Sequence, residues 1–143
     1  MNNAGIHEAS HAAIYLTLDR ADVQIIELTL DGNAGFCHFR SRLPPVANAT
    51  IAGYVGEMRA IEGKDWRPTP EMFKENLHLQ DISDAVKIVG LEGMPALWDE
   101  CAEILDLHWG KILAIADALT ERGKLSGNEV DEIWRKFDGL NSY

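Results

Sequence analysis

Basic residues are scarce in this 143-residue sequence: 13 Lys and Arg stand against 23 Asp and Glu, which gives a formal net charge of −10. Nucleic acids and anionic membrane surfaces are bound through clustered Lys and Arg that neutralise phosphate groups. The composition therefore argues against both as partners. The hydrophobic content of 46% and the charged content of 25% are typical of a soluble globular protein.

Long apolar runs are also missing. The sequence has no run of eighteen apolar residues, the length needed to span a bilayer, and its first fifteen residues have no basic segment and contain His7, Glu8 and His11. The only cysteines, Cys37 and Cys101, lie far apart. We expect a cytoplasmic protein without a membrane span, in which both cysteines are reduced packing residues.

Internal repeats, low-complexity blocks and interdomain linkers are absent, so we expect one domain over residues 1–143. Helical periodicity and capping signals predict an α+β fold that is mostly helical, with a small β-hairpin after the first helix. The predicted helices cover residues 4–18, 47–62, a short segment from 70 with Thr69 as its cap, 81–91, 95–122 and 126–137. The last begins with a capping box formed by Ser126 and Glu129. The predicted strands cover residues 23–30 and 35–39, joined by a turn at 31–33.

The first predicted helix carries the motif HExxH as His7, Glu8 and His11. Histidines four residues apart lie one turn apart on the same face of a helix, so both imidazoles can reach one metal ion. Glu8 is offset from them and can take a proton from a water molecule that the metal activates. The motif predicts a zinc site, while the alternative is a partly buried helix whose histidines bond to backbone or solvent.

A zinc site of this kind needs a third protein ligand, and the longer HExxHxxGxxH motif is absent. The residues with suitable side chains are Glu57, His78, Asp81, Asp84 and His108. His108 falls on the apolar stripe of the predicted 95–122 helix, where a core histidine is the simpler interpretation. Spacing alone does not choose among the others.

Several segments together resemble the peptidase domain of the FtsH-like family, the membrane-anchored zinc proteases with an AAA-type ATPase. IHEASHAAI is similar to the family's HEAGHA helix, with Ser10 in place of glycine. LQDISDAVKIV resembles the segment whose aspartate is the third zinc ligand, and this aspartate falls on Asp81. The strand pair, the 51–63 helix and the 101–134 region are also similar to the family's pattern.

The resemblance implies a zinc metallopeptidase with Zn²⁺ held by His7, His11 and Asp81, and with Glu8 as general base. It also implies that the second strand, Gly35, Phe36, Cys37, His38 and Phe39, binds an extended peptide or unfolded protein by β-addition.

The sequence departs from the family in having neither a phosphate-binding loop of an ATPase nor a membrane helix. A domain without a motor is expected to act on unfolded or flexible segments, as a homo-oligomer or with a separate partner protein. The alternative function is a non-catalytic metal-binding or protein-interaction module that keeps the same fold.

Overall fold

The computed structural model describes residues 3–18, 21–29, 34–41 and 47–140; at 18, 21–25, 28, 38–41 and 138–140 it describes the backbone only. The elements in chain order are α1 (Asn3–Leu18), β1 (Ala21–Leu28), β2 (Gly35–Ser41), α2 (Ala47–Glu62), α3 (Pro70–Glu75), α4 (Gln80–Leu107), α5 (Trp109–Arg122), β3 (Lys124–Ser126) and α6 (Gly127–Leu140). The prediction of a mostly helical α+β chain with a small antiparallel sheet is confirmed.

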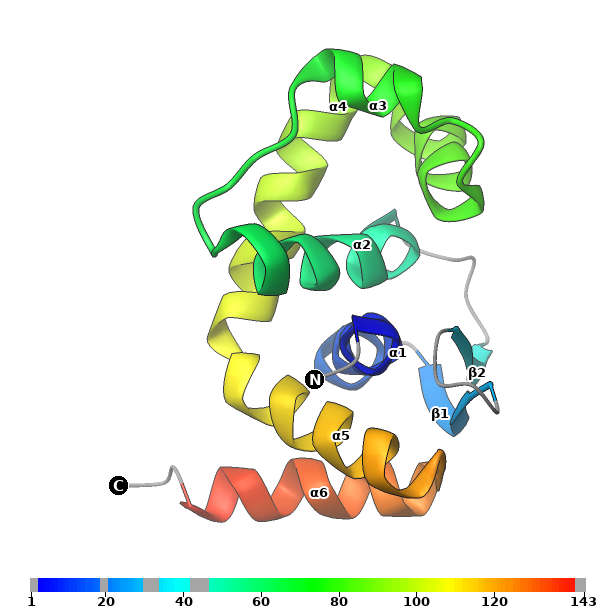
Figure 1. Ribbon diagram of the computed structural model, residues 1–143, viewed down its shortest axis with the longest axis vertical. Helices are drawn as coiled ribbons and strands as arrows, with labels where there is room; N and C mark the ends of the chain where they lie inside the picture. Colours follow the sequence, from blue (N-terminus) through cyan, green and yellow to red (C-terminus); the bar gives the residue numbers. More distant parts are fainter. Residues whose placement is uncertain (1–2, 19–20, 30–33, 42–46, 141–143) are drawn as a thin grey trace.

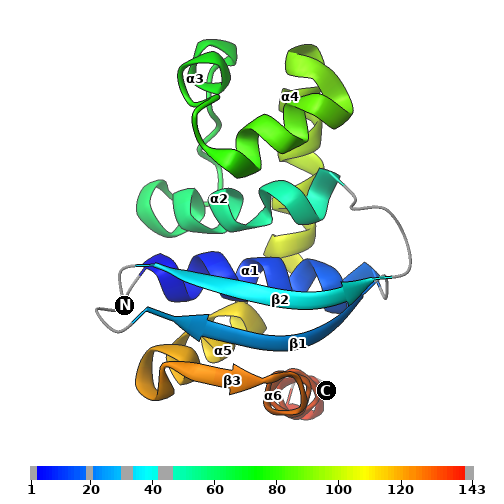
Figure 2. The same cartoon turned by 90° about the vertical axis from the view of Figure 1, so that its right-hand side faces the viewer.

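Helix α1 lies at the centre of the fold. It packs between α2 and α5, and the sheet runs along a third side (Figures 1 and 2). A helix that is apolar on every face is stable only when it is covered on every face. The residues of α1 fit this position, because most are small, apolar and buried: Ala4, Ile6, Ala9, Ala12, Ala13 and Ile14. Two polar side chains of α1, Glu8 and Ser10, are buried with them.

The sheet has the strand order β2-β1-β3, with both pairs antiparallel. β1 and β2 form the predicted hairpin, in which Ile26 pairs with Cys37 and the register shifts between Val23 and Ile25. The predicted turn at residues 31–33 lies outside the described residues. β3 is a strand that the sequence did not predict, since three residues carry no alternation signal. In the described part of the sheet β2 pairs with β1 alone, so it is an edge strand.

Several predicted helix boundaries are confirmed. The helix at 47–62 is α2, and the one at 4–18 is α1, which begins one residue earlier. The hydroxyl of Thr69 accepts a hydrogen bond from the backbone N–H of Met72 at the start of α3. Ser126 and Glu129 form the predicted capping box at the start of α6, through two backbone-to-side-chain bonds of 3.1 and 3.2 Å.

The predicted single helix over residues 95–122 is wrong. Helix α4 already contains Pro95, and the backbone leaves helical geometry at Gly90 (φ 76°, ψ 163°) and again at His108 (φ −118°, ψ 17°). Gly90 can adopt a positive φ because it has no Cβ, so the chain bends there, and α5 runs in a new direction after His108 (Figure 1). The apolar stripe is thus divided between two helices.

Both cysteines are free thiols, as predicted. Cys101 is fully buried, and its thiol donates to the backbone carbonyl of Asn48 at 3.6 Å. Burial raises the pKa of both thiols, which disfavours the reactive thiolate. Among the helices that the structure describes, none has the length and hydropathy needed to cross a membrane.

Candidate metal centre

His7, His11 and Asp81 meet at one point, although 70 residues separate His11 from Asp81. The Nε2 atoms of the two histidines are 3.2 Å apart. Oδ2 of Asp81 lies 3.2 Å from Nε2 of His11 and 3.4 Å from Nε2 of His7. We call these three atoms the ligand triangle.

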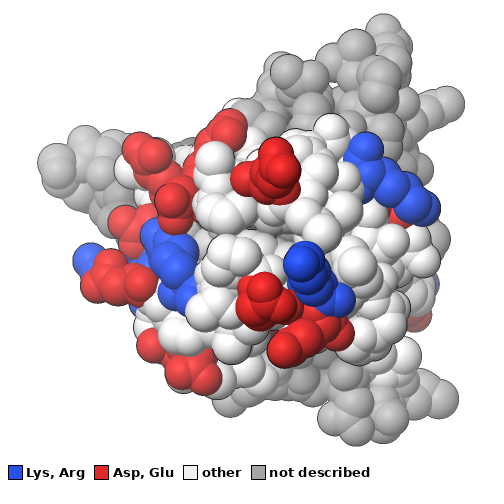
Figure 3. Space-filling model, turned by 90° about the horizontal axis from the view of Figure 1, so that it is seen from above, with Lys and Arg blue, Asp and Glu red and all other residues white. Residues whose placement is uncertain are grey.

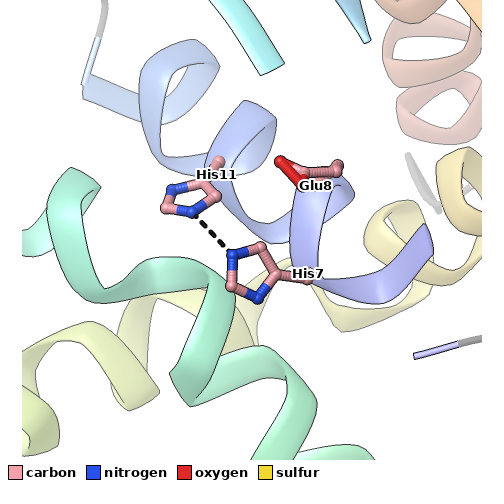
Figure 4. A group of neighbouring side chains, drawn as sticks. All are labelled: His7, Glu8 and His11. Atoms are coloured by element: carbon pink, nitrogen blue, oxygen red, sulfur yellow. Dashed lines mark hydrogen bonds between the residues drawn. The ribbon is translucent and has the colours of Figure 1, made fainter. Parts of the chain in front are cut away.

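Glu8 lies beside the two imidazoles on α1 (Figure 4). Ligand-type atoms of His7, Glu8 and His11 all lie within 4.8 Å of one another, in an arrangement that could hold a metal ion. Glu8 is only 6% exposed. The structure therefore brings together the four residues that the sequence singled out.

The dimensions of the ligand triangle fit a tetrahedral zinc site. With zinc–nitrogen and zinc–oxygen distances of about 2.0 to 2.15 Å, ligand atoms at the corners of a tetrahedron are about 3.3 to 3.5 Å apart. The edges of the triangle are 3.2, 3.2 and 3.4 Å. Two imidazole nitrogens and one carboxylate oxygen are also a ligand set that zinc accepts, and three protein ligands leave a fourth position for water or substrate.

The other ring nitrogen of each histidine has a partner that sets its tautomer. Nδ1 of His11 donates to the backbone carbonyl of Ala49 at 2.7 Å, because a carbonyl oxygen only accepts. Nδ1 of His7 is bonded to the carboxylate of Glu57. In the neutral form of each ring these partners favour the proton on Nδ1, which leaves the Nε2 lone pair facing the ligand triangle. This is the outer-shell arrangement usual for metal-bound histidines.

The electrostatics of the site favour a positive charge at the ligand triangle. Burial opposes protonation of His7, but hydrogen bonds to Asp81 and Glu57 and the charges of Glu8 and Glu57 outweigh it and raise the pKa to about 9. Burial likewise opposes ionisation of Asp81, yet its bonds to His11 and His7 hold its pKa well below the usual range. Burial raises the pKa of Glu8, although both histidines oppose the shift.

The other residues weighed as third ligands have different surroundings. Glu57 supports His7 through Nδ1, as described. Asp84 accepts a bond from Gln80 at 2.7 Å, and His78 is exposed. The ring of His108 lies 5.1 Å from that of Trp134, where α4 ends and α5 begins. None of these contacts places a side chain in the ligand triangle.

Two glycines of α2 allow it to approach α1 closely, a role that the sequence motifs did not predict. A Cβ added at Gly53 would lie 2.3 to 2.5 Å from three ring atoms of His7. A Cβ at Gly56 would lie 1.9 Å from the hydroxyl of Ser10. The spacing Gly-x-x-Gly on a helix was the available signal, since it predicts a face where another helix packs closely.

An open cleft of about 430 Å³ leads to the site. Its lining joins the start of α1 to the start of β2 and comprises Asn3, Ala4, His7, Glu8, Ala34, Gly35 and Glu57. Gly35 and Phe36, both in the predicted peptide-binding strand, are half-buried and 39% exposed, respectively. Cys37 packs against the core, and the side chains of His38 and Phe39 lie outside the described residues.

No protein-family model matches this sequence, and no curated protein matches it significantly. The resemblance to FtsH-like peptidases stays a prediction.

We expect Asp81→Ala to weaken zinc binding by more than the ~10- to 100-fold that loss of an outer-shell partner causes. The variant removes one of the three atoms of the ligand triangle. His78→Ala is the matched control, because His78 is exposed and precedes Asp81 by three residues. Competition with a zinc-binding dye measures both affinities, and weaker binding in His78→Ala alone would overturn the assignment.

We expect Glu57→Ala to lower zinc affinity by about 10- to 100-fold, because Nδ1 of His7 loses the carboxylate that orients the ring. Glu62→Ala serves as the control, since Glu62 is an exposed residue at the end of the same helix. Isothermal titration with zinc separates the two variants. Equal affinities would show that Glu57 does not support the site.

Gly53→Ala is expected to reduce zinc affinity by at least about 10-fold, because the added methyl group must displace the ring of His7. Dye competition measures the affinity, and normal zinc affinity in this variant would contradict the expectation.

Gly56→Ala is expected to lower the free energy of unfolding by about 1–3 kcal/mol through overpacking. Adding Ser10→Gly to Gly56→Ala should restore much of that loss, because it removes the hydroxyl in the way. Urea unfolding measures the stability of Gly56→Ala and of the double variant.

Proposed function

We propose that this chain is a zinc-dependent metallopeptidase that hydrolyses peptide bonds in unfolded or flexible protein segments, with an FtsH-like peptidase fold. The observation that carries the proposal is the ligand triangle with Glu8 beside it. The residues present fit zinc in ligand type, spacing and outer-shell bonding.

His7, His11 and Asp81 are the proposed zinc ligands. Bound zinc would lower the pKa of a water molecule in its open fourth position to about 7 and would polarise the peptide carbonyl. The hydrogen bonds to Ala49 and Glu57 keep both histidine rings in the orientation that presents Nε2. The chain thus holds three ligand atoms at the spacing of a zinc site, and binding of the ion would release the proton that His7, with its pKa of about 9, carries at neutral pH.

Glu8 is the proposed general base. Its carboxylate takes a proton from the attacking water, whose oxygen bonds to the carbonyl carbon of the peptide. When the carbon–nitrogen bond breaks, Glu8 returns the proton to the leaving amine. Glu8 is suited to this exchange because it lies beside both imidazoles and is shielded from solvent, while the cleft that leads to it is open.

The edge strand β2 is the proposed main-chain binding site for the substrate. An extended peptide can add to a sheet edge through backbone hydrogen bonds, which tolerate many sequences. Gly35, the first residue of β2, also lines the cleft with His7 and Glu8, so a peptide laid along this strand would approach the site. A folded substrate has no free extended backbone to offer, which favours unfolded or flexible segments.

Zinc analysis combined with a cleavage assay tests this function. We expect wild type and Glu8→Gln each to bind one zinc, and only wild type to cleave casein, with activity in the variant at least about 100-fold lower because the proton-transfer group is lost. Glu62→Gln, an exposed change outside the cleft, is the control and should keep full activity. Zinc in both proteins with cleavage in neither would favour the non-catalytic module.

A further inference from the structure

Tyr54 of α2 lies directly against the candidate metal centre. Its ring meets the ring of His7 edge-on, with the two centroids 5.1 Å apart and the ring planes at 85°. Tyr54 follows Gly53, whose missing Cβ leaves the space for the ring of His7. Glu57, three positions later on the same face of α2, bonds Nδ1 of that ring. Helix α2 therefore brings a phenol as well as a carboxylate to His7.

The hydroxyl of Tyr54 has no hydrogen-bond partner among the residues that the structure describes, although the side chain is half-buried. Buried tyrosine hydroxyls usually have one. Burial raises the pKa of Tyr54, and the charges of Asp81 and Glu57 add to the shift because both carboxylates are near the phenol. The hydroxyl therefore keeps its proton at neutral pH and can donate a hydrogen bond.

The proposed reaction needs a hydrogen-bond donor at this place. When water attacks a peptide carbonyl, the electron pair of the C=O π bond moves onto the oxygen, and a donor already in position stabilises the negative charge. Glu8, Glu57 and Asp81 are carboxylates that repel such a charge when they are ionised. The two histidines present Nε2 to the ion and have partners at Nδ1, so neither ring has a spare donor.

Two other donors nearby are less well placed than Tyr54. Tyr15, one turn after His11 on α1, is only 9% exposed and packs in the core, so a substrate cannot reach it. Asn3 lines the cleft but is exposed, and a hydrogen bond in contact with water stabilises a charge less than one in a shielded site. Tyr54 is both shielded and accessible, because it also forms part of the wall of an apolar pocket of about 340 Å³ between α2, α3 and α4.

Charges on the outer surface do not replace this donor. The face seen from above α3 and the first half of α4 carries basic and acidic side chains interspersed around uncharged surface, without a continuous basic patch on the coloured residues (Figure 3). Arg59 is paired with Asp106, and Arg67 with Asp99. Such a mixed surface adds no strong field of one sign, so stabilisation must come from groups in contact with the substrate.

We propose that the hydroxyl of Tyr54 donates a hydrogen bond to the carbonyl oxygen of the peptide bond that is cut, and stabilises the negative charge that this oxygen gains in the transition state. This inference rests on the proposed peptidase function and adds a catalytic residue to it. Tyr54 keeps its proton throughout. The electron pair returns to the carbonyl when the carbon–nitrogen bond breaks, while Glu8 carries the proton from the attacking water to the leaving amine.

Turnover is measured first, on protein saturated with zinc. The substrate is a quenched fluorescent peptide that spans a cut site mapped in casein. Tyr54→Phe removes the hydroxyl and keeps the ring against His7. We expect kcat to fall by about 10- to 100-fold, because one donor to the oxygen is lost while the metal still shares the charge, and KM and zinc affinity to stay within about twofold of wild type.

Two further variants separate the hydroxyl from the ring. Tyr54→Leu removes both, so it should lose the same catalytic contribution and also weaken zinc binding, because the ring of His7 loses its edge contact. Met58→Leu is the matched control, since Met58 is another half-buried residue of α2 in the wall of the apolar pocket, and it should keep kcat and zinc affinity. Thermal unfolding of each variant checks that the fold persists.

Binding without turnover gives a second readout. A phosphinic peptide of the same sequence carries charged oxygens on a tetrahedral phosphorus in place of the planar carbonyl, so it resembles the transition state. We expect zinc-loaded Tyr54→Phe to bind it about 10- to 100-fold more weakly than wild type. The uncut substrate peptide should bind Glu8→Gln equally well with and without Tyr54→Phe. Isothermal titration calorimetry measures these affinities.

Parallel losses of kcat and of affinity for the phosphinic peptide, with zinc affinity unchanged, would support the inference. An unchanged kcat in Tyr54→Phe, an unchanged affinity for the phosphinic peptide, or a loss of kcat that a matching loss of zinc affinity explains would overturn it while the peptidase function stands. If wild type cleaves neither casein nor any peptide, the peptidase function is overturned and the inference with it.

Discussion

Helix α2 approaches α1 so closely that side chains and backbone groups of α2 contact both histidines of the candidate site. Gly53 leaves the space that the ring of His7 occupies, and Gly56 leaves the space for Ser10. The same approach brings the carbonyl of Ala49 within hydrogen-bond distance of Nδ1 of His11, and the carboxylate of Glu57 within hydrogen-bond distance of Nδ1 of His7. One helix thus fixes both histidine rings from outside the ligand triangle. Buried interiors are packed too tightly to absorb an extra methyl group at such a contact without a shift of its neighbours.

Asp81, the proposed third ligand, comes from a distant part of the chain. Asp81 stands in the first turn of α4, and the break at Gly90 separates this turn from the part of α4 that carries Trp98 and Cys101 into the core. Buried Ile82 and Ala85 anchor the short segment before the break. The candidate metal centre therefore combines helix α1 with a segment that has its own packing against α2 and α3.

Much of this arrangement could be predicted from the sequence, for reasons that differ among the elements. Local signals predicted α1, α2, the hairpin and the caps at Thr69 and Ser126, because periodicity and capping act within a few residues. The prediction of one helix over residues 95–122 is wrong because the apolar spacing continues across His108, where the backbone leaves helical geometry. Spacing left Asp81 undecided against Glu57, since only the tertiary fold shows which carboxylate faces Nε2 and which faces Nδ1. Gly53 was missed because its role is to leave space for a residue 46 positions earlier.

The position of Asp81 and Ile82 as neighbours in one turn has a mechanical consequence. The side chain of Asp81 is a corner of the ligand triangle, and that of Ile82 lines an apolar pocket between α2, α3 and α4. Because the two residues are adjacent in one helical turn, a shift of that turn would move both the carboxylate and the wall of the pocket. The affinity of the site for an ion and the width of the pocket therefore depend on the same few backbone angles.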